Sequence, residues 1–134
     1  MIVFIVLSSA ACRDDQATKH WGNEFVQQVA GRQVHAKLSV LGNSTSEPLA
    51  AVLILQGEGI APLREEVSII SSLGRSVISV NGAEQQRSSE FLLYMNTADG
   101  SLKRIGVDPS ERAIFMQNSE GTLRELLEFW EKRK

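Results

Sequence analysis

Few residues of this chain have a type and spacing that could do chemistry. Its two histidines, His20 and His35, fall on different expected elements, and neither has a carboxylate or a cysteine at metal-ligand spacing. A zinc site needs three or four such ligands. The sequence therefore predicts no metal and no cofactor, and the alternation around His35 predicts an exposed histidine on the wet face of a strand.

The most suggestive loop begins at Gly57 and ends at Pro62, between an expected buried strand and an expected helix. A glycine-rich loop there can direct backbone N–H groups at an anion. It lacks the Lys-Ser/Thr pair of a P-loop and the third glycine of a dinucleotide fingerprint, and Glu58 would repel a phosphate. We therefore interpret its glycines as residues that a turn requires.

Nucleophiles and paired carboxylates also lack partners. No serine lies in a Gly-x-Ser-x-Gly elbow. The adjacent pairs 14–15 (Asp-Asp) and 65–66 (Glu-Glu) would point about 100° apart on a helix, so neither forms an acid/base couple by itself. Trp21 and Trp130 sit on apolar faces and are expected in the core. The sequence predicts no catalytic residues, and hence a protein that is not an enzyme.

The charge balance excludes one class of partner. The chain has 134 residues and a net charge of −2, and its basic residues are dispersed apart from a Lys-Arg-Lys tail at 132–134. A nucleic-acid footprint needs a wider positive patch. We expect no nucleic-acid partner, and the length suits one domain.

The N-terminus carries the clearest compartment signal. An apolar run, Ile-Val-Phe-Ile-Val-Leu at 2–7, is followed by small residues at 8–11, by Cys12 and by the polar residues 13–16. This is the shape of an export signal, and the run is too short to span a bilayer. The segment resembles the lipobox of bacterial lipoproteins. It departs from that pattern in two ways: no basic residue precedes the apolar run, and Ser9 stands where leucine is usual.

The resemblance implies a compartment and a modification. Residues 1–12 would be the export segment, Cys12 would be lipidated and become the mature N-terminus, and residues 13–134 would form the globular domain. Arg13 in place of an aspartate implies outer-membrane placement, facing the periplasm. The alternative interpretation is a cytoplasmic protein in which residues 2–7 are a buried strand and Cys12 is a small core residue.

Three helices are expected to position these residues. The first covers residues 14–30, where Trp21, Phe25 and Val29 recur every fourth residue, although Gly22 is unfavourable inside a helix. The second runs from Pro62 to Gly74. The third begins near residue 122 with a capping box of Thr122 and Glu125 and continues with an apolar face.

Strands are expected at 34–40, 50–55, 77–80, 91–95, 102–107 and 113–116. Residues 50–55 are apolar on both faces, as in a central strand. The segments 91–95 and 102–107 flank a turn and predict a hairpin. The dipeptide at 81–82 (Asn-Gly) could make a tight turn, but the polar residues 83–90 favour a longer loop.

These elements predict an α+β fold in a single domain. Its sheet is mainly antiparallel, with about five strands and three helices in the order α-β-β-α-β-β-β-β-α.

Two functions are consistent with these observations. The first is a small lipid-anchored envelope protein that binds another protein without catalysis, as an immunity protein or as an accessory lipoprotein of a secretion apparatus. The polar loops at 43–47 and 83–90 would then be the candidate binding protrusions. The alternative is a cytosolic small-molecule-binding domain or enzyme with a pocket at the loop from Gly57 to Pro62.

Overall fold

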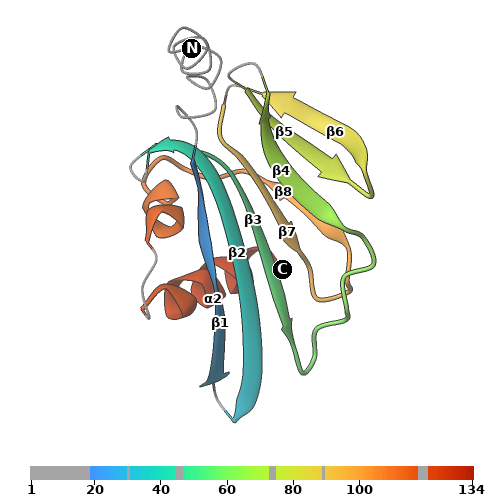
Figure 1. Ribbon diagram of the computed structural model, residues 1–134. Helices are drawn as coiled ribbons and strands as arrows, with labels where there is room; N and C mark the ends of the chain where they lie inside the picture. Colours follow the sequence, from blue (N-terminus) through green and yellow to red (C-terminus); the bar gives the residue numbers. More distant parts are fainter. Residues whose placement is uncertain (1–18, 30, 45–46, 73–74, 89, 118–120) are drawn as a thin grey trace, which may run out of the picture.

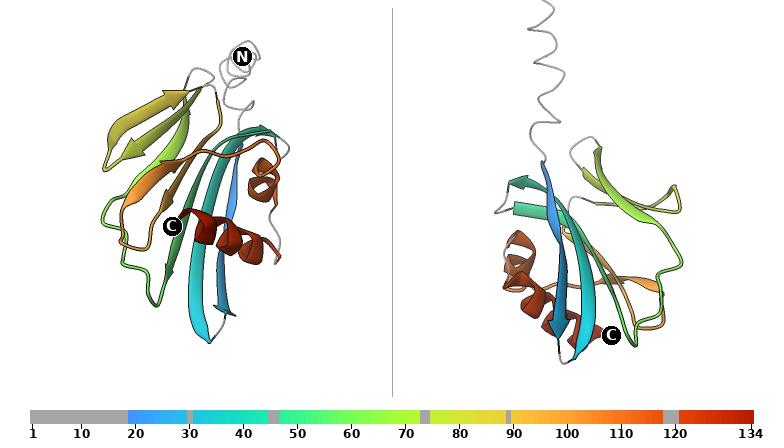
Figure 2. Two further views of the ribbon diagram at one scale, coloured as in Figure 1. Left: turned by 180° about the vertical axis from the view of Figure 1, so that it is seen from behind. Right: turned by 60° about the horizontal axis from the view of Figure 1, so that its bottom comes forward.

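Two sheets and a helical layer make up the fold (Figures 1 and 2). The computed structural model describes residues 19–29, 31–44, 47–72, 75–88, 90–117 and 121–134. Within these residues the chain forms eight strands, one 3-10 helix and one α-helix. The mixed α+β class is therefore correct in its coarse form, but strands dominate, and the expectation of three helices is not confirmed.

The larger sheet has five strands in the order β1-β2-β3-β7-β8. Neighbouring strands are antiparallel except β3 and β7, which run parallel because the smaller sheet is inserted between them in the chain. Its strands are β1 (Lys19–Val29), β2 (Arg32–Ser44), β3 (Glu47–Gly57), β7 (Leu92–Asn96) and β8 (Leu102–Ile105).

The smaller sheet is antiparallel, in the order β4-β5-β6. It lies against one face of the larger sheet, and the helical layer covers the opposite face (Figure 2, right). Its strands are β4 (Val67–Ser72), β5 (Arg75–Val80) and β6 (Ala83–Ser88), and the helical layer consists of η1 (Arg112–Met116) and α2 (Thr122–Arg133).

The core is arranged around β3, which is buried on both faces as its apolar run predicted. Leu53 and Leu55 belong to the cluster under α2, whereas Ala50 and Val52 belong to the cluster under the smaller sheet. Because β-strand side chains alternate between faces, a strand in the middle layer must be apolar at every position.

The expected strand at 34–40, the hairpin around residues 97–100 and the last helix are also confirmed. The helix begins at Thr122, however, with Gly121 as its N-cap and without a side-chain capping bond. The capping box expected of Thr122 and Glu125 is therefore not formed.

The helix expected at 14–30 is wrong over the residues that the structure describes, because 19–29 form β1. A spacing of four residues fits a helix, but it also keeps every residue on one face of a strand. Trp21 and Phe25 do pack on the core under the helical layer. Gly22 has a φ of +153°, and a Cβ there would lie 2.1 Å from the Leu38 carbonyl oxygen, so its place in the strand requires glycine.

The helix expected at 62–74 is also wrong, because residues 67–72 form β4. Val67 and Ile69 face the larger sheet, whereas Ser68 is exposed and Ile70 is 50% exposed. This is period-two burial of β-branched residues, which favour strands. Their apolar positions had suggested a helical stripe only because residues 63, 67 and 70 also fit a period near 3.6.

Two shorter segments differ from expectation as well. Asn81 and Gly82 have φ values of 52° and 83° and make the tight turn between β5 and β6, so the polar segment after them is a strand and not a long loop. Residues 113–116, expected as a strand, lie in η1, where Phe115 is fully buried against Phe91 and Phe129.

Candidate functional site

The predicted lipidation site lies outside the residues that the structure describes. Cys12 and the export segment at 1–12 therefore remain predictions. The 43–47 loop is largely taken up by the ends of β2 and β3, and the 83–90 loop is mostly β6. Neither segment forms the long protrusion that the sequence suggested, within the described part of the chain.

The loop from Gly57 to Pro62 is held by its neighbours. The Ala61 N–H donates to the Ala98 carbonyl at 2.8 Å, and Arg32 donates to the Glu58 carbonyl at 3.1 Å. A Cβ on Gly100 would lie 2.6 Å from the Pro62 carbonyl oxygen, so the turn after β7 fits closely against this loop. No helix begins at Pro62, so the helix expected there is absent, and with it the helix N-terminus that an anion site would have needed.

The two histidines lie on neighbouring strands. His20 is exposed on β1, and His35 on β2 faces away from the helical layer but is half-buried, whereas its alternation predicted an exposed side chain. The Nε2 atom of His35 lies 3.4 Å from an oxygen of Glu24, and the His35 side chain is 37% exposed. Across the described residues, no group of three metal-ligating side chains comes together.

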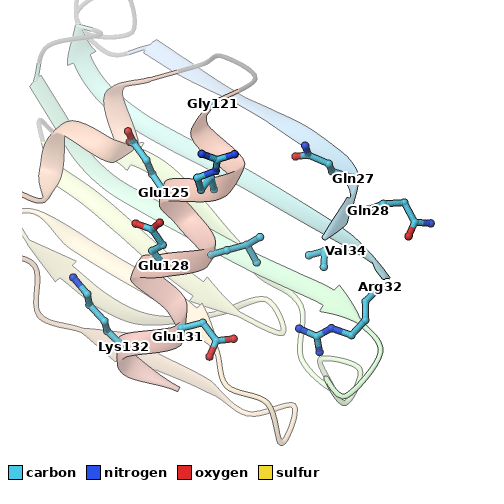
Figure 3. Close-up of a pocket in the computed structure, with 11 residues that line it drawn as sticks. Gln27, Gln28, Arg32, Val34, Gly121, Glu125, Glu128, Glu131 and Lys132 are labelled. Carbon is cyan, nitrogen blue, oxygen red and sulfur yellow. The ribbon is translucent and has the colours of Figure 1, made fainter. Parts of the chain in front are cut away.

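A large recess with a volume of about 980 Å³ lies between α2 and the end of the β1–β2 hairpin (Figure 3). We call it the edge groove because it lies at the β1 edge of the larger sheet. It is lined by Gln27 and Gln28 of β1, Arg32 and Val34 of β2, Gly121, and Arg124, Glu125, Leu127, Glu128, Glu131 and Lys132 of α2.

The amphipathic pattern of α2 explains this groove. Leu123, Leu126 and Trp130 are buried against the sheet, and the next positions around the helix form the wall of the groove. Val34 of β2 lies on the strand side of the groove (Figure 3) and is 3% exposed, so it forms a buried apolar floor beside the half-buried Leu127.

The rim of the edge groove is polar and has both signs of charge. Three carboxylates and three cationic side chains line it. Arg32 also donates to the Glu58 carbonyl, and Glu131 forms an ion pair with Lys134 at 3.0 Å. These exposed charges are screened by solvent, so the groove has no strong preference for a highly charged ligand.

A second recess, the His35 groove, lies on the opposite face of the larger sheet. Its volume is about 430 Å³, and its lining includes His35, Lys37 and Gln56 from the sheet and Glu65 and Glu66 from the segment before β4. The Nε2 atom of His35 is buried and accepts or donates no hydrogen bond among the described residues.

Sequence reasoning missed the edge groove because it placed the strand side of the groove on a helix. Gly22 in the middle of the expected helix was the available signal, together with the β-branched and aromatic residues around it. The wall formed by α2 could be predicted as an exposed helical face, but its distance from the β1–β2 hairpin depends on tertiary packing.

Comparison with known proteins adds no family to this geometry: no protein-family model, curated protein or solved structure matches the chain at a significant level. None of the helices that the structure describes has the length and apolarity to cross a membrane.

Proposed function

We propose that this chain is a non-catalytic protein-binding module, tethered through a lipid on Cys12 to the bacterial cell envelope and facing the periplasm from the outer membrane. The observation that carries the binding role is the edge groove beside β1. The tether rests on the lipobox-like sequence around Cys12 alone.

The anatomy of the edge groove favours a protein ligand. Small-molecule pockets are mostly apolar with a few polar groups that fix orientation. The lining of the edge groove is likewise more apolar than polar, but its rim carries several exposed polar and charged side chains, including Gln28, Arg32 and Glu128. An apolar centre within a polar, solvent-exposed rim is the usual arrangement of a protein–protein interface.

The edge groove also changes which surface an immunity or assembly role would use. The segment 83–88, suggested as a binding protrusion, is an edge strand of the smaller sheet. We therefore place the binding surface on α2 and β1 for both versions of the function, a toxin-immunity protein or an accessory lipoprotein of a secretion apparatus.

Site-specific photocrosslinking in the bacterial host tests the binding role. A photoreactive residue at Gln28, which lines the edge groove, should give a discrete adduct with a second protein. The matched control is Ser68, which is exposed on β4 of the smaller sheet. Adducts of the same identity from both positions, or none from Gln28, would contradict the proposal.

The tether has its own test. The intact mass of the protein recovered from host membranes should correspond to a chain that begins at Cys12 and carries acyl groups. Cys12→Ser should abolish this species. A soluble, unmodified chain that retains Met1 in its own host would reject the tether and favour the cytosolic alternative.

The alternative function is a small-molecule binder, and one observation favours it. The His35 groove contains a buried ring nitrogen that makes no hydrogen bond among the described residues and lies 3.4 Å from the Glu24 carboxylate, and such a group usually has an explanation. A ligand that bound there would perturb the His35 ring resonances in an NMR spectrum, and His35→Phe would remove its binding. This pocket is separate from the loop from Gly57 to Pro62, where the sequence had placed it.

A further inference from the structure

We infer that β1 accepts an added β-strand: an extended segment of a partner protein that has apolar side chains on one face and a lysine or arginine opposite Glu24 on the other. This inference rests on the proposed protein-binding function and specifies its partner.

The outer side of β1 has unused backbone groups. β1 is an edge strand of eleven residues, and among the described residues it pairs with β2 alone, in unbroken register from Lys19↔Gly42 to Val29↔Arg32. A two-residue turn makes Val29↔Arg32 a hydrogen-bonded pair, so the odd-numbered residues of β1 bond to β2. The even-numbered residues, such as Val26, then direct their N–H and C=O groups outward, although the outward N–H of Glu24 donates to the Asn23 side chain at 3.0 Å.

Little protects this edge against pairing. Native edge strands are usually kept short, or carry lysine, proline or strong bulges. Between Gly22 and Gln28, Glu24 is the single charged residue, and there is no proline. Val26 is 58% exposed, the highest value among the large apolar side chains that the structure describes.

The edge groove lies where side chains of an added strand would enter. On the helical face of β1, Trp21 and Phe25 pack on the core and Gln27 lines the groove. Alternate side chains of a new strand would lie beside these residues and over the apolar floor at Val34. The partner segment therefore needs apolar residues at every second position.

Charge selects the partner on the opposite face. Glu24 is 60% exposed at the midpoint of β1, where Lys37 of β2 lies opposite it in register and the Nε2 atom of His35 is 3.4 Å from its carboxylate. A second copy that paired in full antiparallel overlap would place Glu24 directly opposite its own counterpart, and like charges in that position are unfavourable. A foreign segment with a lysine or arginine there pairs favourably, so we assign the surface to a partner and not to a second copy.

Peptide selection tests this inference. Random short peptides are displayed and selected against the full chain, and synthetic versions of the enriched peptides are titrated against it. We expect alternating apolar residues with a basic residue on the other face. Val26→Pro removes an outward N–H and should weaken the binding of these peptides about tenfold or more. The variant should still fold, because edge strands tolerate proline where the N–H faces solvent. Phe25→Pro, which removes an N–H used by β2, is the control for general disruption.

A second variant and a second readout keep the test independent of the proline. Glu24→Lys should reverse the selection, so that acidic residues replace basic ones, with a change of up to about fivefold for a fixed lysine peptide. In the free protein, the amide hydrogen of Val26 should exchange with solvent quickly and those of Asn23 and Phe25 slowly, and a bound peptide should protect the amide of Val26.

Several outcomes would overturn the inference. These are peptides without alternation, equal binding to a folded Val26→Pro protein, selection unchanged by Glu24→Lys, slow exchange at Val26 in the free protein, or no enriched peptide. A stable dimer crosslinked through Val26 would replace the partner with a second copy. A host adduct at Gln28 together with any of these results would leave protein binding in place and reject strand addition alone.

Discussion

The two edges of the five-stranded sheet are built in different ways. β1 has eleven residues, and every one of them pairs with β2. β8 has four residues, two of which are the exposed cations Lys103 and Arg104. It pairs with β7, which in turn pairs in parallel with β3 over only four residue pairs. A long edge held by pairing can receive another strand, whereas a short, charged edge is protected against one.

Side chains replace strand pairing on the β8 side. Where β7 leaves β3, the side chain of Asn96 accepts from the Leu55 N–H at 2.9 Å and donates to the Leu55 carbonyl at 2.7 Å. Trp130 of α2 donates to the Asn96 carbonyl at 2.6 Å. Both carboxylate oxygens of Glu111 accept from the Arg133 guanidinium at 2.7 Å, and this lowers the pKa of the Glu111 carboxyl. The same contacts join the last turn of α2 to the segment before η1.

The largest expected effect is at Asn96. Asn96→Ala removes two hydrogen bonds and leaves the buried N–H and C=O of Leu55 without partners, so the free energy of unfolding should fall by about 4 kcal/mol. Urea denaturation measures the change. If Asn96→Ala cost no more than an exposed substitution such as Lys103→Ala, the comparison of the two edges would be wrong.

Gly22 on the β1 side should come second. Gly22→Ala would place a Cβ against the Leu38 carbonyl at a φ of +153°, and we expect a loss of about 3 kcal/mol in the free energy of unfolding. Gly31→Ala is the matched control, because Gly31 also has a positive φ but has open space around it, and it should cost about 1 kcal/mol. Equal losses in the free energy of unfolding would show that the positive φ, and not the contact with the Leu38 carbonyl, destabilises Gly22→Ala.

The two tryptophans give a paired comparison across the sheet. Trp130→Phe removes a buried donor at 2.6 Å from the Asn96 carbonyl, and should cost about 2 kcal/mol in the free energy of unfolding. Trp21→Phe removes a half-buried donor at 3.3 Å from the Phe115 carbonyl, and should cost about 1 kcal/mol. Thermal unfolding of both variants in one buffer checks the order, and the reverse order would contradict it.

The smallest effect is expected at the turn that precedes β8. Asp99 accepts from the Thr97 and Ser101 hydroxyls and from the Ser101 N–H, and these bonds hold the pKa of Asp99 well below its ordinary value. A carboxylate whose pKa is lower in the folded state stabilises the fold above the ordinary aspartate range, and this contribution is lost as the pH falls.

Asp99→Asn should therefore lower the Tm slightly at pH 7, by less than the substitutions above because the site is exposed. The difference in Tm between the two proteins should shrink as the pH falls below about 4, near the ordinary aspartate pKa. A Tm difference that stayed constant from pH 7 to pH 3 would show that the hydrogen bonds at Asp99 do not depend on its charge.

The sequence predictions were correct where the apolar residues of a segment fitted the period of a strand alone, and wrong in two segments whose apolar residues fitted the period of a helix. The alternation in β2 and the doubly apolar run in β3 fit a strand alone, and both were predicted correctly. Trp21, Phe25 and Val29 fit one face of either a strand or a helix, whereas residues 63, 67 and 70 fit a helical stripe alone, and in both segments the helix was wrong. Helical periodicity over a few turns does not distinguish the two when the spacing is four.

The sequence by itself determined the mixed fold class, the central strand, the hairpin at β7–β8 and the last helix, because each has a local pattern with one physical solution. It also supplied the lipobox-like segment from which the proposed tether at Cys12 derives. Only the tertiary structure decided that β1 is a sheet edge and that α2 lies beside it across a groove. Edge position and groove width depend on which strands pair over long separations in the chain, and no local pattern contains that information.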